Sequence, residues 1–246
     1  MFPDDLEIWL NHFEYHARHP RRIPHGLSDR LTPPERRLIA SSLATFQLGE
    51  QSQGGALLRA AAHFARRQRL PNLVRITALF IREEQRHAEL LRGFMEDHRI
   101  PLKSSDWTDR VFRRVRRLAG LELYLHVLIS AELIGNVYYR TLEAATGCLR
   151  LKVLCRTLVA DELAHIGFES HLLLALRARH RAPVRALVRL AHRAFFAGTA
   201  SVVWLTHRTL LRHCGHDARS FLGLCLAQYA FYLEPVAAPL ASTPAP

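Results

Sequence analysis

The chain has 246 residues, of which 49% are hydrophobic and 23% charged, with a formal net charge of +12. This length and composition indicate a globular protein that buries a full core, in one large or two small domains. Residues 1–5 are acidic, unlike a signal peptide, and the longest strongly apolar stretch, 194–205, is too short to span a bilayer. We therefore expect a soluble cytoplasmic protein that does not bind a membrane.

The basic charge comes almost entirely from arginine, since Lys103 and Lys152 are the only lysines. Such a bias, with abundant alanine and leucine, is typical of a GC-rich genome, so we interpret the arginine clusters as solvated helix faces. A surface for nucleic acid or an acidic partner is the less favoured alternative. The cysteines form no Cys-x-x-Cys motif and are expected to be reduced, mostly buried thiols. They are Cys148, Cys155, Cys214 and Cys225.

Taken in chain order, the sequence predicts an all-α protein, because hardly any segment alternates with period two. Thr32 is a candidate N-cap with Pro33 at the first helical position. The helix that follows is weakened near its middle by Gly54–Gly55. A basic segment, 104–117, carries its own cap, and the Pro/Ala-rich tail from residue 235 is expected to be disordered. The expected helices cover about residues 4–18, 33–69, 71–101, 120–147, 149–180, 183–213 and 215–233.

The strongest functional signal is the string 82–87, in which Glu84 and His87 are three residues apart. On an α-helix this spacing places both side chains on one face. Residues in alternating steps of four and three continue that face, as on a helix that packs against a core. The face reads Leu73, Thr77, Phe80, Glu84, His87, Leu91 and Phe94. Because an ionised carboxylate is costly to bury without a partner, we expect a cation beside it.

The same pattern recurs at Glu162 and His165, although this composition predicts only about one Glu-x-x-His pair by chance. An acid precedes the glutamate of each motif, Glu83 in the first and Asp161 in the second. The second face reads Leu151, Cys155, Leu158, Glu162, His165, Glu169 and Leu172. Two motifs in the same phase make an accidental pattern improbable.

Two further helices each place a single glutamate, Glu50 or Glu132, in the middle of an apolar face. One face reads Ile39, Leu43, Phe46, Glu50, Gly54 and Leu57, and the other reads Leu125, Leu128, Glu132, Gly135 and Tyr139. The four glutamates follow one another at intervals of 34, 48 and 30 residues. Each Glu-x-x-His helix therefore has a single-glutamate helix before it.

This set resembles the ligands of ferritin-like di-iron carboxylate proteins, in which two helices supply one Glu each and two supply Glu-x-x-His. The resemblance covers about residues 33–180 and is closer to the oxygen-activating branch than to ferritin. That branch includes the ribonucleotide reductase small subunit, multicomponent monooxygenases, acyl-carrier-protein desaturases and arylamine N-oxygenases; residues 83–87 are similar to the desaturase motif.

For the fold, we expect one domain over 1–235, a ferritin-like four-helix bundle with a crossover between its second and third helices. A short N-terminal helix and two additional C-terminal helices, at about 183–234, would complete it.

The resemblance implies a dinuclear metal centre. Hard oxygen and imidazole ligands suit iron or manganese, so two iron ions are expected, with Mn/Fe or Mn/Mn as alternatives and O₂ as co-substrate. Glu83 and Asp161 would each accept a hydrogen bond from the histidine of the opposite helix. The expected ligands are bridging Glu84 and Glu162, terminal Glu50 and Glu132, and one histidine per ion, His87 and His165.

Several neighbours of this site carry weaker expectations. Asn136 could hydrogen-bond an oxygen species at the metals, and Glu169 could act in the outer layer or as an extra ligand. Gly54 and Gly135 could either open space for oxygen and substrate or allow close helix packing. We interpret the two tyrosines at 138–139 as core residues.

The function expected from this resemblance is a di-iron oxidoreductase that hydroxylates, desaturates or N-oxygenates a small or carrier-bound organic substrate. It would need an external electron donor, and a homodimer is expected. The alternatives are a ferroxidase or iron-storage protein, a manganese catalase, a tRNA-modifying hydroxylase of the same fold, and a non-catalytic helical module.

Overall fold

The computed structural model describes residues 3–51, 54–105 and 120–234, and all regular secondary structure in these ranges is α-helical, as the sequence predicts. The basic segment from residue 106 and the tail from residue 235 lie outside the described residues. Among the helices described, none is long and apolar enough to cross a membrane. The helices are α1 (Pro3–Arg18), α2 (Pro33–Glu50), α3 (Gly55–Gln68), α4 (Pro71–Asp97), α6 (Leu121–Ala144), α7 (Leu149–Ala178), α8 (Ala182–His213) and α9 (Ala218–Leu233).

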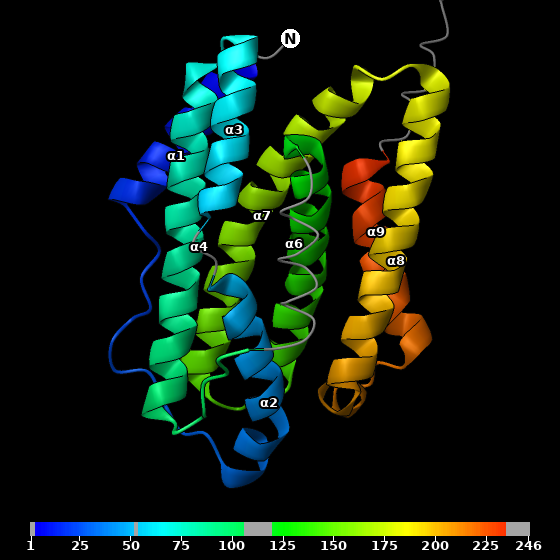
Figure 1. Ribbon diagram of the computed structural model, residues 1–246. Helices are drawn as coiled ribbons and strands as arrows, with labels where there is room; N and C mark the ends of the chain where they lie inside the picture. Colours follow the sequence, from blue (N-terminus) through cyan, green and yellow to red (C-terminus); the bar gives the residue numbers. More distant parts are fainter. Residues whose placement is uncertain (1–2, 52–53, 106–119, 235–246) are drawn as a thin grey trace, which may run out of the picture.

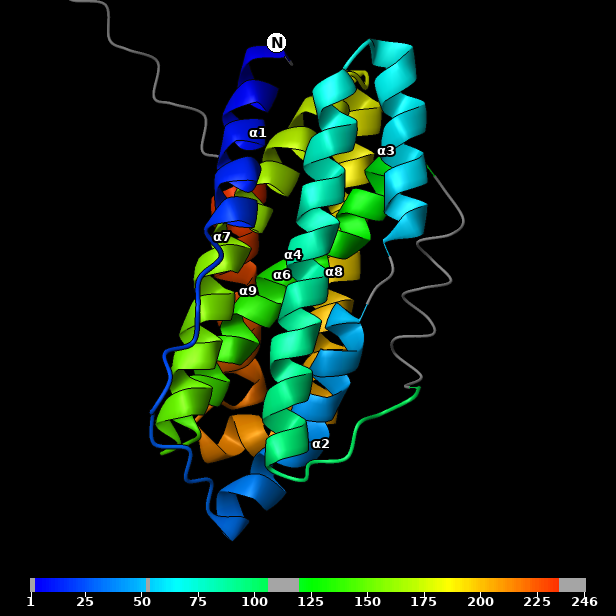
Figure 2. The same ribbon diagram turned by 90° about the vertical axis from the view of Figure 1, so that its left-hand side faces the viewer.

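The helices form a bundle of four rods, one of which consists of two helices. Helices α2 and α3 lie end to end beside α4, and α6 and α7 complete the bundle (Figure 1). Helix α1 packs along α4 on one side of this bundle (Figure 2). Helices α8 and α9 form an antiparallel pair that covers α6 and α7 on the other side. This is the predicted ferritin-like architecture with its N-terminal and C-terminal additions.

The direction of the rods confirms the predicted crossover. The start of α2 lies beside the end of α4, where Arg36 Nη1 donates to the His98 carbonyl at 3.4 Å. The start of α2 also lies beside the end of α6, where the Gly147 amide donates to Glu35 Oε1 at 2.5 Å. Helices α4 and α6 therefore run in the same direction, and the connection between them joins opposite ends of the bundle.

The start of α2 shows how local sequence fixes a helix end. The Thr32 hydroxyl accepts a hydrogen bond from the Glu35 amide, and the Glu35 side chain accepts one from the Thr32 amide. This reciprocal pair satisfies two donors that a helix otherwise leaves free, and Pro33 needs no donor at its position. The predicted N-cap is confirmed.

The expected single helix over 33–69 is wrong, because the chain breaks into α2 and α3. Gly54 adopts a left-handed conformation with φ of +64° and caps the start of α3. A Cβ atom at Gly54 would lie 2.6 Å from Cγ1 of Ile81. The glycine pair therefore lets the chain start a new helix and brings its backbone against α4, a stronger effect than the weakening expected from helix propensity.

The apolar core divides into two clusters, with a polar layer between them. One cluster includes Phe80, Leu128 and Ile166, and the other includes Leu91 and Leu158. On α4 and α7 the glutamates and histidines of the predicted site lie between the residues of these two clusters, whereas Glu132 on α6 lies among residues of the first cluster. The bundle thus buries a band of charge between two apolar halves.

Replacing Gly54 tests the break between α2 and α3. Gly54→Ala should reduce the free energy of unfolding by about 2–4 kcal/mol, because alanine is strained at positive φ and its methyl group overlaps Ile81. Gly93→Ala is the matched control: Gly93 lies inside α4, and a Cβ there would meet nothing within 4 Å. It should stabilise the protein by up to about 1 kcal/mol in denaturant unfolding. Equal effects of the two substitutions would contradict this account.

The carboxylate of Glu35 should make a pH-dependent contribution to stability. Hydrogen bonds from Gly147 and Thr32 lower the pKa of Glu35 from 4.5 to about 2. The folded state thus favours the ionised form, so its contribution is complete above pH 4.5 and is lost as the pH falls toward 2. Glu35→Gln should cost about 1 kcal/mol at neutral pH, and the difference from wild type should shrink over that acidic interval. A difference that does not change with pH would disprove the assignment.

Candidate metal centre

Four predicted ligands converge at mid-height between α4 and α7. Glu84 and His87 come from one helix, Glu162 and His165 from the other, and each of the four is at most 8% exposed. One potential ligand atom from each residue lies within 4.8 Å of the other three. The i, i+3 spacing on two facing helices therefore produces a single cluster, as the sequence predicts.

The atoms of this cluster are close without satisfying one another. Nδ1 of His165 lies 2.9 Å from Oε1 of Glu84, and Nδ1 of His87 lies 3.2 Å from Oε1 of Glu162. Yet Glu84 Oε1, Glu162 Oε1 and His87 Nδ1 are buried and have no partner with hydrogen-bond geometry. Buried polar atoms of this kind are rare because they are costly. Their lone pairs face a shared space, which is the arrangement that bound cations would satisfy.

Glu50 and Glu132 reach the same place from α2 and α6. Both line one cavity together with Glu84 and Glu162. Glu132 shares a hydrogen bond with Glu162, and Glu50 Oε1 accepts a hydrogen bond of 2.5 Å from the Tyr139 hydroxyl. The structure thus brings all four predicted glutamates to one site, the two from the Glu-x-x-His motifs and the two from the other helices.

The electrostatics show how this charge is tolerated in the folded chain. Burial alone would lower the pKa of His87, but Asp161, Glu162 and Glu84 hold it well above its ordinary value. The pKa of His165 is likewise raised, against the effect of burial, by neighbouring carboxylates. Protons on these rings therefore offset the negative charge, and bound cations would replace those protons.

The acids without a paired histidine respond in the opposite way. Burial, together with the charges of Glu84 and Glu162, raises the pKa of Glu50 and Glu132 well above the ordinary range. The folded chain therefore favours the neutral form of these two carboxyl groups. Two divalent cations would favour the ionised form of all four glutamates.

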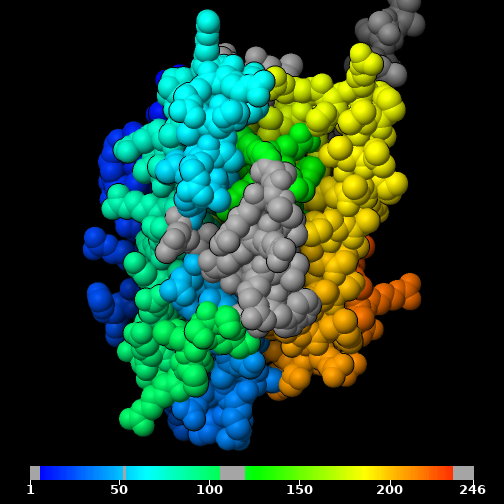
Figure 3. Space-filling model, in the orientation of Figure 1, coloured from blue at the N-terminus to red at the C-terminus, as the bar shows by residue number. Residues whose placement is uncertain are grey.

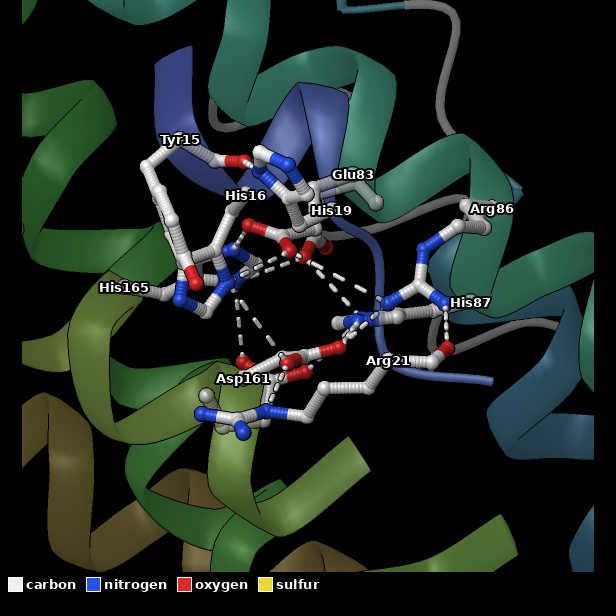
Figure 4. A network of polar contacts seen from close by, with 11 residues as sticks. Tyr15, His16, His19, Arg21, Glu83, Arg86, His87, Asp161 and His165 are labelled. Carbon is white, nitrogen blue, oxygen red and sulfur yellow. Dashed lines mark hydrogen bonds and ion pairs between the residues drawn. The ribbon is translucent and has the colours of Figure 1, made fainter. Parts of the chain in front are cut away.

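The acids that precede the two motifs orient the imidazole rings (Figure 4). Nε2 of His87 lies 3.2 Å from Asp161 Oδ2, and Nε2 of His165 lies 3.1 Å from Glu83 Oε2. Each acid thus contacts the histidine of the opposite helix, which leaves both Nδ1 atoms facing the carboxylate cluster. A hydrogen bond of this kind fixes the tautomer and the ring orientation that a metal needs.

A further layer of basic side chains surrounds these acids, and sequence reasoning missed it. Arg21 Nε donates to Asp161 Oδ1 at 2.7 Å, and Arg86 also pairs with Asp161. His16, on α1, has Nδ1 at 3.5 Å from Glu83 Oε1. Arg86 lies within the first motif, so its place beside the predicted ligands could have indicated a role at the site. Nothing in the sequence connects Arg21 or His16 with the site, because both are more than 60 residues away from it.

On the side away from the histidines, the glutamates border a cavity of about 170 Å³ with mainly apolar walls. Gly135 lines it, and a Cβ there would meet only Tyr139, at 3.9 Å, so this glycine leaves open space. Gly54 also lines the cavity, but Ile81 fills the space that its side chain would take. Helix α8 contributes His207 to the wall, a residue that the sequence did not connect with the site.

The weaker expectations have mixed outcomes. Tyr139 is a core residue, but it also donates to Glu50, and its place on the face of Glu132 was the available signal. Asn136 accepts from Arg140 Nε at 3.0 Å and does not line the cavity. Glu169 lies outside the four-residue cluster; both its oxygens are buried without a hydrogen-bond partner. Burial and the charges of Glu84 and Glu162 raise the pKa of Glu169.

No protein-family model and no curated protein sequence matches this chain. Solved structures do. An R2-like ligand-binding oxidase with an aerobically reconstituted metal cofactor after photoconversion is similar over 93% of both chains, with a TM-score of 0.64 and 17% identity. Two variants of R2-like ligand-binding oxidase with a Mn/Fe cofactor match over the same share with the same TM-score, at 17% and 16% identity.

This likeness shows the fold, which is the ferritin-like fold of those oxidases. A coverage of 93% extends well beyond the residues 33–180 that the motifs alone suggested. The similarity therefore extends into the C-terminal helices α8 and α9, which the motifs of the sequence do not reach.

Metal binding should release protons. Because neighbouring carboxylates raise the pKa values of His87 and His165, the folded chain favours the protonated form of both rings, and each ring loses a proton when it binds a cation. Calorimetric titration of the metal-free protein with Mn²⁺ in buffers of different ionisation enthalpy should show release of about two protons from the histidines, plus any from the neutral glutamic acids. Affinity should fall as the pH is lowered. His87→Asn should release one proton fewer, and binding without proton release would contradict the assignment.

Proposed function

We propose that this protein is an oxidoreductase that activates O₂ at a dinuclear metal centre and oxidises a small or carrier-bound organic substrate. The observation that carries the proposal is the cluster of Glu84, His87, Glu162 and His165, in which three buried ligand atoms have no hydrogen-bond partner. These atoms are Glu84 Oε1, His87 Nδ1 and Glu162 Oε1. The metals would supply the electron transfer and oxygen binding, and the protein would supply position, charge and a dry cavity.

Each predicted ligand has a place in this proposal. Glu84 and Glu162 lie between the two histidines and are suited to bridge two ions. His87 and His165 offer Nδ1, one to each ion, while Asp161 and Glu83 hold the rings. Two further carboxylates from α2 and α6, those of Glu50 and Glu132, would complete the set.

The metal pair is proposed to be Fe/Fe or Mn/Fe. Four carboxylates and two imidazoles suit both metals, because hard oxygen and nitrogen donors bind iron and manganese alike. The Mn/Fe cofactor of the R2-like ligand-binding oxidases supports the mixed pair as a second choice. The external electron donor and the homodimer stay predictions.

The cavity favours oxidation of an organic substrate over iron storage. It opens directly onto the four glutamates, and its other walls are mainly apolar, including Phe80, Leu128 and Val203. An apolar chamber beside the metals suits a carbon skeleton, whereas iron in transit needs oxygen ligands along its path. Tyr139, which donates to Glu50 at the cavity wall, would hold that carboxylate in place.

Replacing one bridging residue tests the proposed centre. Protein reconstituted with ferrous iron should hold two ions per chain and, on admission of O₂, develop the absorption bands of an oxidised dinuclear centre. Glu84→Gln should lower metal affinity by at least about 100-fold and abolish the bands, since even outer-layer partners of a metal site contribute ten- to hundredfold. Circular dichroism should show a retained helical fold, because glutamine has nearly the same size and shape as glutamate.

Glu89→Gln is the matched control, since Glu89 lies on the same helix but faces solvent. It should bind metal and react with O₂ as wild type does. Equal oxygen reactivity in Glu84→Gln and wild type would rule out the proposed site. Two bound metals without any reaction with O₂ would rule out the proposed activity and leave a metal-stabilised helical module.

A further inference from the structure

A second cleft lies beside the start of α6, N-terminal to Glu132 on the same helix. It has a volume of about 830 Å³ and is bounded by α3, the start of α6, the end of α7 and α8. Figure 3 shows α6 at the floor of a recess between α3 and α8. Its walls are largely apolar and include Phe64, Leu121, Leu176, Val188 and Phe195. Val127 is the one residue that lines both this cleft and the cavity beside the glutamates.

A buried arginine without a carboxylate partner lies behind this cleft. Arg177 is only 2% exposed, and its Nη1 atom has no hydrogen-bond partner. Its other nitrogens contact two histidines that line the cleft: Nε lies 3.4 Å from Nε2 of His126, and Nη2 contacts Nδ1 of His192. The Tyr229 side chain also hydrogen-bonds Arg177, and the charge of Glu122 acts on it. No carboxylate among the described residues forms an ion pair with this guanidinium, although a buried guanidinium is usually paired with an acid.

The arginine determines the form of both histidines. Burial and the charge of Arg177 lower the pKa of His126 to about 3, and burial with the charges of His126 and Arg177 does the same for His192. A neutral His126 that accepts a hydrogen bond at Nε2 must carry its proton at Nδ1. Nothing among the described residues hydrogen-bonds that Nδ1 atom. Since His126 lines the cleft, the ring offers the cleft one N–H donor.

The charges around the cleft also favour an anion. Arg179 lies at its edge, with its guanidinium 5.6 Å from the centre of the Phe64 ring, and Arg189 is close enough to affect the pKa of Arg177. The one carboxylate that lines the cleft is Glu122, which pairs with His180 at 2.8 Å. The basic side chains that line the cleft are thus Arg179 and the histidines, with Arg177 behind them, and they stand against the single carboxylate of Glu122. One oxygen of Glu122 pairs with His180, while Oε1 is buried without a hydrogen-bond partner.

We propose that this cleft binds an organic anion, a carboxylate with an apolar body, whose charged group lies against Nδ1 of His126 within the field of Arg177 and Arg179. The apolar body would lie along Phe64, Val188 and Phe195. One N–H donor in an apolar cleft backed by fixed positive charge selects an anion over a neutral or cationic analogue. This site is distinct from the metal centre and does not depend on the proposed oxidation.

Isothermal titration calorimetry of the metal-loaded full chain with three matched probes tests this site. Phenylbutyrate, phenylbutanol and phenylbutylamine share one apolar body and differ in charge. The carboxylate should bind at least tenfold more tightly than the alcohol, a difference of about 1.4 kcal/mol, and the amine should not bind. No saturable binding of phenylbutyrate at millimolar concentration, or equal affinity for acid and alcohol, would overturn the proposal.

Variants then locate the binding. Val188→Trp should fill the cleft from the accessible side of α8 and weaken phenylbutyrate binding at least tenfold, and Arg179→Gln should weaken it several-fold. Leu187→Trp is the control, because Leu187 is 66% exposed and does not line the cleft; it should bind as wild type does. Gly135→Leu narrows the other cavity and should leave binding unchanged. Binding that survives Val188→Trp and is lost in Gly135→Leu would place the carboxylate beside the metals and overturn the assignment.

Discussion

The concentration of carboxylates halfway along the bundle is the constraint on which the rest of the structure depends. An apolar core with a band of ionised acids in it would be unstable, because each unpaired buried charge costs several kcal/mol. This chain offsets the cost in layers. Imidazoles from α4 and α7 lie among the carboxylates, Asp161 and Glu83 hold those rings from outside, and Arg21 and Arg86 compensate Asp161 in turn.

This layered arrangement gives the site two different sides, one closed by protein and one open to a cavity. The side with the histidines is closed by α1, where His16 approaches Glu83 and Phe13 stacks on His165 with ring centres 5.9 Å apart. The opposite side, lined by glutamates and apolar residues, remains open as a cavity. Rigid support on one face and open space on the other is what a reactive metal pair requires, since its ligands must be held while a substrate enters.

The two C-terminal helices contribute to both cavities of the protein. Helix α8 supplies part of the wall of the cavity beside the glutamates and part of the wall of the second cleft. Its His192 and the Tyr229 of α9 join a buried polar cluster around Arg177 that lies well away from the metal ligands. The chain therefore holds two buried charged clusters of opposite sign, one built from acids and the other from arginine with neutral histidines. Such contrasting environments along one bundle can bind chemically different partners at separate places.

The sequence by itself determined the helical class, the N-cap at Thr32 and the glutamates and histidines that meet between the helices, because each depends on spacing along a single helix. It also indicated the crossover, through the length of the connection between the second and third helices of the bundle. The period of 3.6 residues places Glu84 with His87 and Glu162 with His165 on one face of each helix. Since all four glutamates lie on the apolar, core-facing side of their helices, they were expected to meet in the interior of the bundle. Even the contact of Asp161 with His87 followed from a repeated position before the motif.

Only the tertiary structure decided the features that depend on distant segments meeting. The break at Gly54 arises because Ile81 on another helix occupies the space of a side chain. The arginine layer, the His207 wall and the Arg177 cluster join residues that no local period connects. Whether a polar residue is buried, paired or left to face a cavity is set by packing between helices, and that packing is not encoded in the spacing within any one of them.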